Sequence, residues 1–158
     1  MKKKEEMRRI IRLYKEKTGK KEYEMHEVAE FAVKTMGWPL PTPKGPMDQL
    51  AELFSKAARE ETRKDSVTGH SYRANLAATT WSGGKQLTLW ADIDQAPRKF
   101  ARKSFVQRRE QMVGDAVQLT LDLRHWNRVN QNEEPIDMPM DFTEDVEWRL
   151  NAPEDEAV

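Results

Sequence analysis

The chain has 158 residues, of which 37% are apolar and 34% are charged, so it can bury one modest core. It contains no cysteine, which excludes disulfides, thiolate metal sites and cysteine nucleophiles. No apolar run approaches the length of a membrane span, and none follows the charged N-terminus, so we expect a cytoplasmic protein that does not contact the membrane.

The net charge of zero conceals a strong segregation of charge along the chain. Residues 1–132 carry 26 basic and 17 acidic side chains, a net charge of +9, whereas residues 133–158 carry one basic and 10 acidic side chains, a net charge of −9. This pattern predicts a basic body that binds polyanions and an acidic tail that makes a contact of its own. A tail that only keeps the protein in solution is the alternative.

Two amphipathic helices are predicted at the N-terminus. The first spans about residues 4–18, where apolar side chains recur at helical spacing, and Gly19 stands at its expected end. The second spans about residues 24–36 and ends before Gly37. Each has a single apolar stripe, which is typical of a helix with one buried face.

A stiff connector and a third helix follow. Three prolines make residues 38–45 extended, and we favour a helix connector over a proline-rich ligand for an aromatic groove. Pro46 in the first position and Asp48 in the first turn suit the start of a third helix, which we expect to end near Asp65.

Apolar and polar residues then alternate in two short stretches, residues 72–78 and residues 87–93. Between them lies a glycine turn in the segment Trp81–Lys85. Alternation of period two on both sides of a Gly-Gly pair predicts a β-hairpin.

One long helix is predicted from about residue 97 to residue 129. Phe105, Met112, Leu119 and Trp126 stand seven positions apart and form a heptad seam. Apolar residues also alternate from 117 to 123 as in a strand, but the heptad pattern extends further. The seam predicts a homodimer joined through this helix, and packing of the seam against the first three helices is the alternative.

The chain turns acidic after residue 130, and three prolines interrupt it, so we expect an extended tail. Large apolar residues stand among the acids, and the partner-binding candidates are Phe142, Val146 and Trp148. Such anchors suit docking on a basic, partly apolar groove. The groove belongs either to this protein's own body or to a separate basic protein.

The order of three helices and a hairpin over roughly residues 4–94 resembles the winged-helix class of DNA-binding domains. The resemblance implies that the third helix enters the major groove and that the hairpin contacts the DNA backbone. The residues that it assigns to DNA are Gln49, Ser55, Lys56, Arg59 and Arg63 in the third helix and Arg73 and Lys85 in the hairpin. The connector before the third helix is longer than the tight turn of that class.

A second basic cluster opens the long helix. Six positive charges fall within twelve residues, with no acidic residue among them: Arg98, Lys99, Arg102, Lys103, Arg108 and Arg109. Such a block at helical spacing is typical of a phosphate-binding surface. A solvated helix face is the alternative, although such faces usually carry both signs.

The predicted fold is therefore mainly α with a small β-hairpin, an α+β chain in three parts. A winged-helix-like part spans residues 1–95, the long basic helix spans residues 96–130, and the acidic tail spans residues 131–158. The C-terminal half is also similar to a set of uncharacterised bacterial proteins, through the stretches Arg108–Asp115 and Asp141–Val146. This similarity implies a bacterial or phage origin and no mechanism.

Enzymatic chemistry has little support in the sequence. The three histidines lack neighbours at metal-ligand spacing, apart from Glu30, which stands four residues after His26, and there is no glycine-rich phosphate loop. We therefore expect no enzyme, metal or cofactor. The predicted function is binding of nucleic acid, duplex DNA in particular, by a bacterial or phage regulator. The alternative is an adaptor or antitoxin-like inhibitor that binds a basic partner through its acidic tail.

Overall fold

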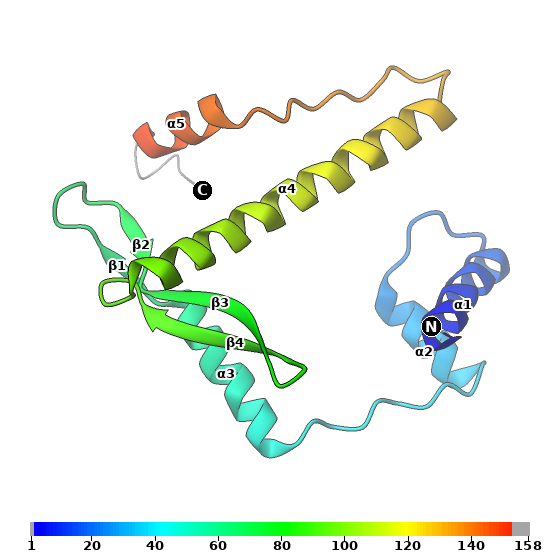
Figure 1. Ribbon diagram of the computed structural model, residues 1–158. Coiled ribbons are helices and arrows are strands. Elements are labelled where there is room, and N and C mark those ends of the chain that lie inside the picture. The colour runs from blue at the N-terminus through cyan, green and yellow to red at the C-terminus, as the bar shows by residue number, and fades with distance from the viewer. Residues whose placement is uncertain (1, 153–158) are drawn as a thin grey trace. The chain divides into compact units, whose positions relative to one another are not determined.

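The computed structural model describes residues 2–152, which form helices and short antiparallel strands (Figure 1). In chain order the elements are α1 (Lys2–Thr18), α2 (Met25–Lys34), α3 (Pro46–Glu60), β1 (Thr62–Lys64), β2 (Ser71–Arg73), β3 (Asn75–Ser82), β4 (Lys85–Asp92), α4 (Arg98–Val129) and α5 (Thr143–Asn151). The predicted hairpin and the predicted first, second and long helices are confirmed. None of the helices in residues 2–152 combines the length and the apolar composition that crossing a membrane requires.

The chain divides into two compact units, and the boundary falls inside α3, between Leu53 and Phe54. The expected division into residues 1–95, 96–130 and 131–158 stays a prediction. The last six residues of the predicted tail, 153–158, lie outside the described residues.

The first unit is built around the contact between α1 and α2. Tyr14 is buried there, with its ring edge-to-face against Tyr23 and Phe31 at centroid distances of 5.8 and 5.7 Å. Its hydroxyl donates a hydrogen bond of 2.9 Å to Glu27, which also accepts one of 3.0 Å from the ammonium group of Lys20. These two donors lower the pKa of Glu27, so that carboxylate is held in its charged form.

The second unit contains the β3–β4 hairpin. Ser82 pairs with Lys85 across a two-residue turn in which Gly83 and Gly84 have φ of 56° and 75°. A tight hairpin turn with positive φ at both central residues favours glycine, which explains why the Gly-Gly pair predicted this element. Leu76 and Ala78 of β3 are buried and supply part of the small core.

Helix α4 lies beside β3 and satisfies backbone groups on the side of the strand that β4 leaves open (Figure 1). The buried Ser104 hydroxyl donates a hydrogen bond of 2.7 Å to the carbonyl oxygen of Ala77. The Gln107 amide accepts from the N–H of Thr79 and donates to its carbonyl, both at 2.8 Å. Gln107 thus bonds as a neighbouring strand would, so α4 both orients itself on the hairpin and closes an open sheet edge.

The third helix ends at Glu60, and the prediction that it continues to about Asp65 is wrong. Residues 62–64 form β1, which pairs antiparallel with β2 in a second small hairpin that the sequence patterns did not show. The Asp65 carboxylate accepts the backbone N–H groups of Val67 and Thr68 at 2.8 and 3.2 Å. This side-chain turn begins the loop that returns the chain from β1 to β2, so residues 62–73 form a hairpin in place of a longer helix.

The tail was predicted to be extended, and this is correct only for the residues that precede α5. Thr143 donates hydrogen bonds to Asp141 through its backbone N–H at 3.1 Å and through its hydroxyl at 2.8 Å. These bonds lower the pKa of Asp141 and fix the chain where α5 begins. Glu144 and Asp145 then fall in the first turn, where acidic residues stabilise a helix.

Candidate nucleic-acid interface

The first three turns of α4 present a basic face to solvent, which we call the basic face: Arg98, Lys99, Arg102, Lys103 and Arg109. At about 100° per residue, these five side chains fall within roughly 140° of arc. Ser104 and Gln107, which bond to β3, lie on roughly the other side of the same turns. The contact with the hairpin therefore turns the basic face outward.

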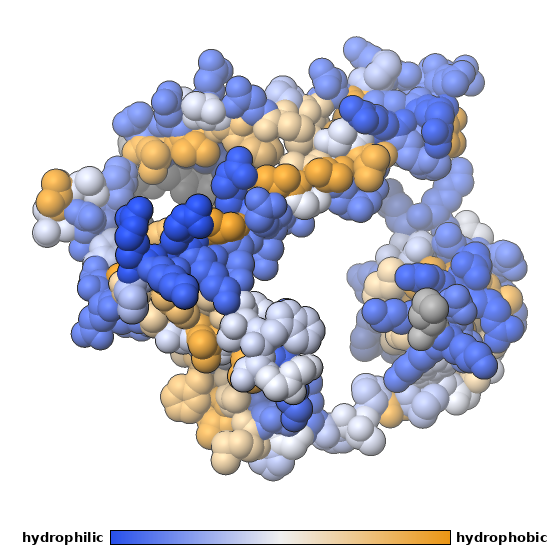
Figure 2. Space-filling model, in the orientation of Figure 1, coloured by the Kyte–Doolittle hydropathy of each residue, from blue (hydrophilic) through white to orange (hydrophobic). Residues whose placement is uncertain are grey.

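The described residues do little to neutralise the charges of the basic face. All five side chains are exposed, and the one ion pair that any of them makes with a described residue is between Arg109 and its neighbour Glu110, at 3.8 Å. Both partners of this pair are largely solvated, so it offsets little of the charge. The surface where the first turns of α4 meet the strands is densely hydrophilic (Figure 2).

Arg108 is not part of the basic face, because it lies on the side of α4 that faces the strands. There it lines a recess of about 310 Å³ together with Arg59 of α3 and Arg73 of β2, so three residues predicted to bind nucleic acid meet in one place. We call this hollow the arginine recess. Its other lining residues are Asn75, Ala77, Thr79, Thr88, Trp90, Ser104, Gln107 and Gln111. No described acidic residue lines it.

Packing at the end of α3 positions Arg59 in the recess. The Asn75 amide donates hydrogen bonds to the Ala58 carbonyl at 3.0 Å and to Glu61 at 2.8 Å, which ties the helix end to β3. The Arg59 guanidinium lies over the Trp90 ring, 5.6 Å from its centroid. This cation–π contact orients a charged group that would otherwise move freely.

Arg63, also predicted to contact DNA, has partners within the protein. Its guanidinium bonds to both carboxylate oxygens of Asp92, with Nη1–Oδ1 at 3.0 Å, and to Asp94 at 2.7 Å. This pairing lowers the pKa of Asp92 to about 2 and raises that of Arg63. Arg63 therefore joins β1 to the end of β4.

The other residues that the winged-helix resemblance assigned to DNA are dispersed. Lys56 is exposed on α3, and Ser55 beside it is half-buried. Lys85 is exposed at the tip of the β3–β4 hairpin. Gln49 belongs to the other compact unit, where its side-chain amide donates to the Lys44 carbonyl at 2.7 Å. Their joint action on DNA stays a prediction.

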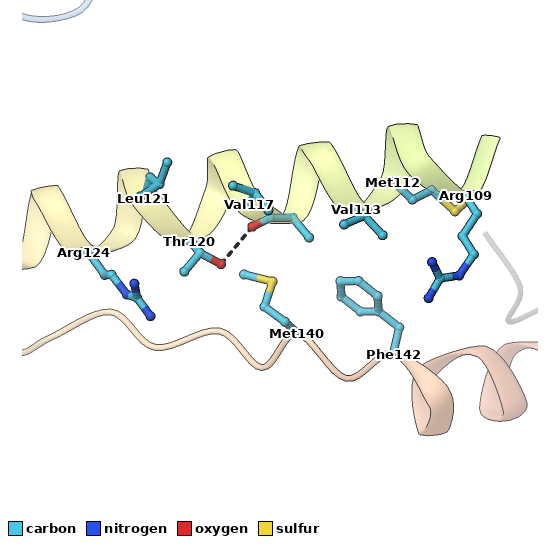
Figure 3. Close-up of a pocket in the computed structure, with 10 residues that line it drawn as sticks. Arg109, Met112, Val113, Val117, Thr120, Leu121, Arg124, Met140 and Phe142 are labelled. Carbon is cyan, nitrogen blue, oxygen red and sulfur yellow. Dashed lines mark hydrogen bonds between the residues drawn. The ribbon is translucent and has the colours of Figure 1, made fainter. Parts of the chain in front are cut away.

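The outer face of α4 changes character beyond Arg109. An apolar groove of about 560 Å³ continues along it, which we call the tail groove, and Met140 and Phe142 of the C-terminal segment point into it (Figure 3). The helix contributes Arg109, Met112, Val113, Ala116, Val117, Thr120, Leu121 and Arg124. Figure 2 shows the corresponding band of apolar side chains over the middle of α4.

The end of α4 fixes the direction of the tail. Asn127 accepts the backbone N–H of Ile136 at 2.9 Å and donates to its carbonyl at 2.8 Å. From this clamp the chain returns antiparallel to α4, so Phe142 lies near Arg109 and α5 begins just beyond (Figure 3). Of the predicted partner-binding residues, Phe142 lines the tail groove and is 50% exposed, whereas Val146 and Trp148 lie outside the groove and are 53% and 61% exposed.

The heptad seam on α4 is open to solvent. Phe105, Met112, Leu119 and Trp126 are between 40% and 60% exposed, and only Met112 of the four lines the tail groove. An exposed apolar row of this kind suits a further contact, and its use in a homodimer stays a prediction.

Several polar residues with structural roles have no recognisable signal in the sequence. Ser104 and Gln107 bind a strand edge, and Asn127 binds the returning tail, yet each is a polar residue in a charged helix whose pattern gives no sign of a contact. Within residues 2–152 no group of three His, Asp or Glu side chains is placed to hold a metal ion. Comparisons with protein-family models, curated proteins and solved structures found no match for this chain.

Proposed function

We propose that this protein binds nucleic acid, duplex DNA in particular, through the basic face of α4. The observation that carries the proposal is that five exposed positive charges share one side of a rigid helix and are left without effective counter-charges by the described fold. A structural role accounts for Arg63, whose partners are carboxylates of β4 and the turn after it. Among residues 2–152 no such partner accounts for the basic face, and we expect phosphates to supply the counter-charge.

The dimensions of the basic face are compatible with a nucleic-acid backbone. Eleven residue steps separate Arg98 from Arg109, which is about 16 Å at 1.5 Å per residue. Double-stranded DNA carries one phosphate charge per roughly 1.7 Å of axis, so several phosphates fall within that length. Each phosphate that is neutralised releases counterions, and the resulting binding is strongly dependent on salt.

A salt titration with the full chain and a generic fluorescent duplex tests the proposal. If four or five phosphates are contacted, log K should fall against log salt with a slope of about −4 to −5. Binding that does not depend on salt, or no binding at about 50 mM salt, would contradict it.

A second function is favoured by one specific observation. Trp148 on the acidic helix α5 is 61% exposed, although tryptophan is the residue that most often anchors a protein interface. We infer, as the alternative, that the protein is an adaptor or inhibitor and that it binds a basic partner protein through α5. Trp148→Ser separates the two functions, because it should abolish capture of such a partner and leave the affinity for DNA unchanged.

A further inference from the structure

We propose that the arginine recess is a binding site for a terminal phosphate, that is, a phosphate monoester carried on a nucleotide. The inference rests on the proposed function where the phosphate ends a nucleic-acid strand, and it names the group that this part of the protein recognises. A free nucleotide carries the same group. The recess is distinct from the basic face, because Arg108 and the basic face lie on different sides of α4.

Charge is the first argument. Three arginines from three elements line the recess, and the side chain of none of them forms a hydrogen bond or an ion pair with another residue in the range 2–152. Arg63 on the adjacent strand shows the opposite arrangement, because two carboxylates neutralise it. The fold therefore supplies acids for one arginine of this region and leaves three converging arginines for an external anion.

Rigidity is the second argument. Arg59 is held over the Trp90 ring, and Arg73 lies in β2, where it pairs with Thr62. Arg108 follows Gln107, which is bonded to β3 through both ends of its amide. A site that is organised before its ligand arrives loses less conformational entropy on binding.

Ligand charge and shape are the third argument. A phosphate monoester carries a charge of about −1.5 to −2 and three acceptor oxygens, and guanidinium groups bond such oxygens in pairs. A phosphodiester inside a strand carries one negative charge and leaves two oxygens free, so it matches three arginines less well. At about 310 Å³ the recess lies near the lower limit of small-molecule pockets, and Thr88 and Gln111 add polar groups to its lining.

The test compares one short single-stranded DNA with and without a 5′-phosphate, bound to the full-length protein at fixed salt. The phosphorylated strand should bind about tenfold tighter, the effect of one charge-assisted hydrogen bond or more. Arg73→Gln and Arg108→Gln should each remove this gain, whereas Arg73→Lys should retain part of it. Arg128→Gln is the control, because Arg128 is an exposed arginine in the last turn of the same helix. Circular dichroism should show that all variants are folded.

Competition by inorganic phosphate, a nucleoside monophosphate and the matching nucleoside identifies the source of the ligand. Displacement by the monophosphate but not by the nucleoside supports the site and extends it to free nucleotides, and displacement only by the phosphorylated strand supports it for strand ends. Equal binding of both strands, or a gain that survives in both glutamine variants, would overturn the inference. In that case salt-dependent binding of the unphosphorylated strand would still support the basic face, so the two proposals fail separately.

Discussion

The outer face of α4 has two regions with different chemistry. In the first region, from Arg98 to Arg109, five exposed cationic side chains dominate the face, although Val106 is exposed among them, whereas in the second, from Met112 to Leu121, the face is apolar and Met140 and Phe142 cover it in part. The chemistry of the returning tail matches these two regions. Its apolar residues lie against the apolar region, and the acidic helix α5 begins near Arg109, where the basic region ends. One face of α4 thus carries an apolar groove, in which the tail lies, and a charged surface next to that groove.

We propose, as the central claim, that the acidic tail and nucleic acid share the basic region. Opposite charges on the tail and the body attract one another at low salt, and this attraction weakens as the Debye length falls. The tail is tethered at Asn127, so α5 is kept at high local concentration near the basic face without any tight ion pair.

Removing the basic face should have the largest effect. The triple variant Arg98→Gln/Arg102→Gln/Lys103→Gln deletes three phosphate contacts, so the slope of log K against log salt should become less steep by about 3. Affinity at about 50 mM salt should fall on the order of 100-fold. The control is Arg8→Gln/Arg12→Gln/Lys15→Gln, which removes the same charge from exposed positions of α1. Equal losses in both variants would show that only net charge matters.

Releasing the tail should have the next largest effect, in the opposite direction. Met140→Ser/Phe142→Ser removes the apolar contacts with α4 but leaves every acidic residue in place. Duplex binding at about 50 mM salt should tighten by several-fold up to about tenfold, because α5 no longer competes near the basic face. Trp148→Ser is the matched control, since Trp148 is an exposed residue outside the tail groove. If both variants bind duplex with the same affinity, the contact between the tail and the groove does not affect nucleic-acid binding.

Arg63, which is paired with carboxylates, should affect the stability of the fold and not the binding of nucleic acid. Arg63 lowers the pKa of Asp92 to about 2, so the pair stabilises the folded state above the ordinary aspartate pKa of about 3.9. That stabilisation should disappear as the pH falls from about 4 towards 2. Thermal melts should therefore show a steeper loss of stability over this range in the wild type than in Asp92→Asn. Arg63→Gln should change the melts and leave the salt slope of binding unaltered.

A glycine in the apolar region of α4 offers the smallest effect. Gly114 lies inside α4, and a Cβ atom added there would meet nothing within 4 Å. Gly114→Ala should stabilise the helix by up to about 1 kcal/mol, with a rise in Tm of roughly 2–4 °C. Affinity for nucleic acid should not change, and a change in affinity would mean that bending of α4 at Gly114 takes part in binding.

The sequence predicted those elements that have strong periodicity or turn chemistry. The heptads from Phe105 to Trp126 predicted α4, and Gly83 with Gly84 predicted the hairpin. Strands β1 and β2 have three residues each, too few for an alternating pattern to show. Helix α5 was missed because prolines and acids dominate its surroundings, although its first turn has suitable acids.

The candidate sites were predictable in composition but not in arrangement. The six basic residues of α4 were visible as a cluster, yet their division between the basic face and the recess depends on which side of the helix meets β3. That side is marked by Ser104 and Gln107, whose polarity gives no sign of burial or contact in a helical pattern. In the sequence Arg63 cannot be distinguished from the other arginines, because its partner Asp92 stands 29 residues later and only the fold brings the two together.

The most direct test of the shared face is to compare duplex affinity of the full chain with that of a chain ending at Asn132, over a range of salt concentrations. Competition predicts that the truncated chain binds more tightly at about 50 mM salt and that the ratio of the two affinities approaches one as screening increases. If the two chains bind equally at every salt concentration, the acidic tail does not compete for the basic face and the central claim is wrong.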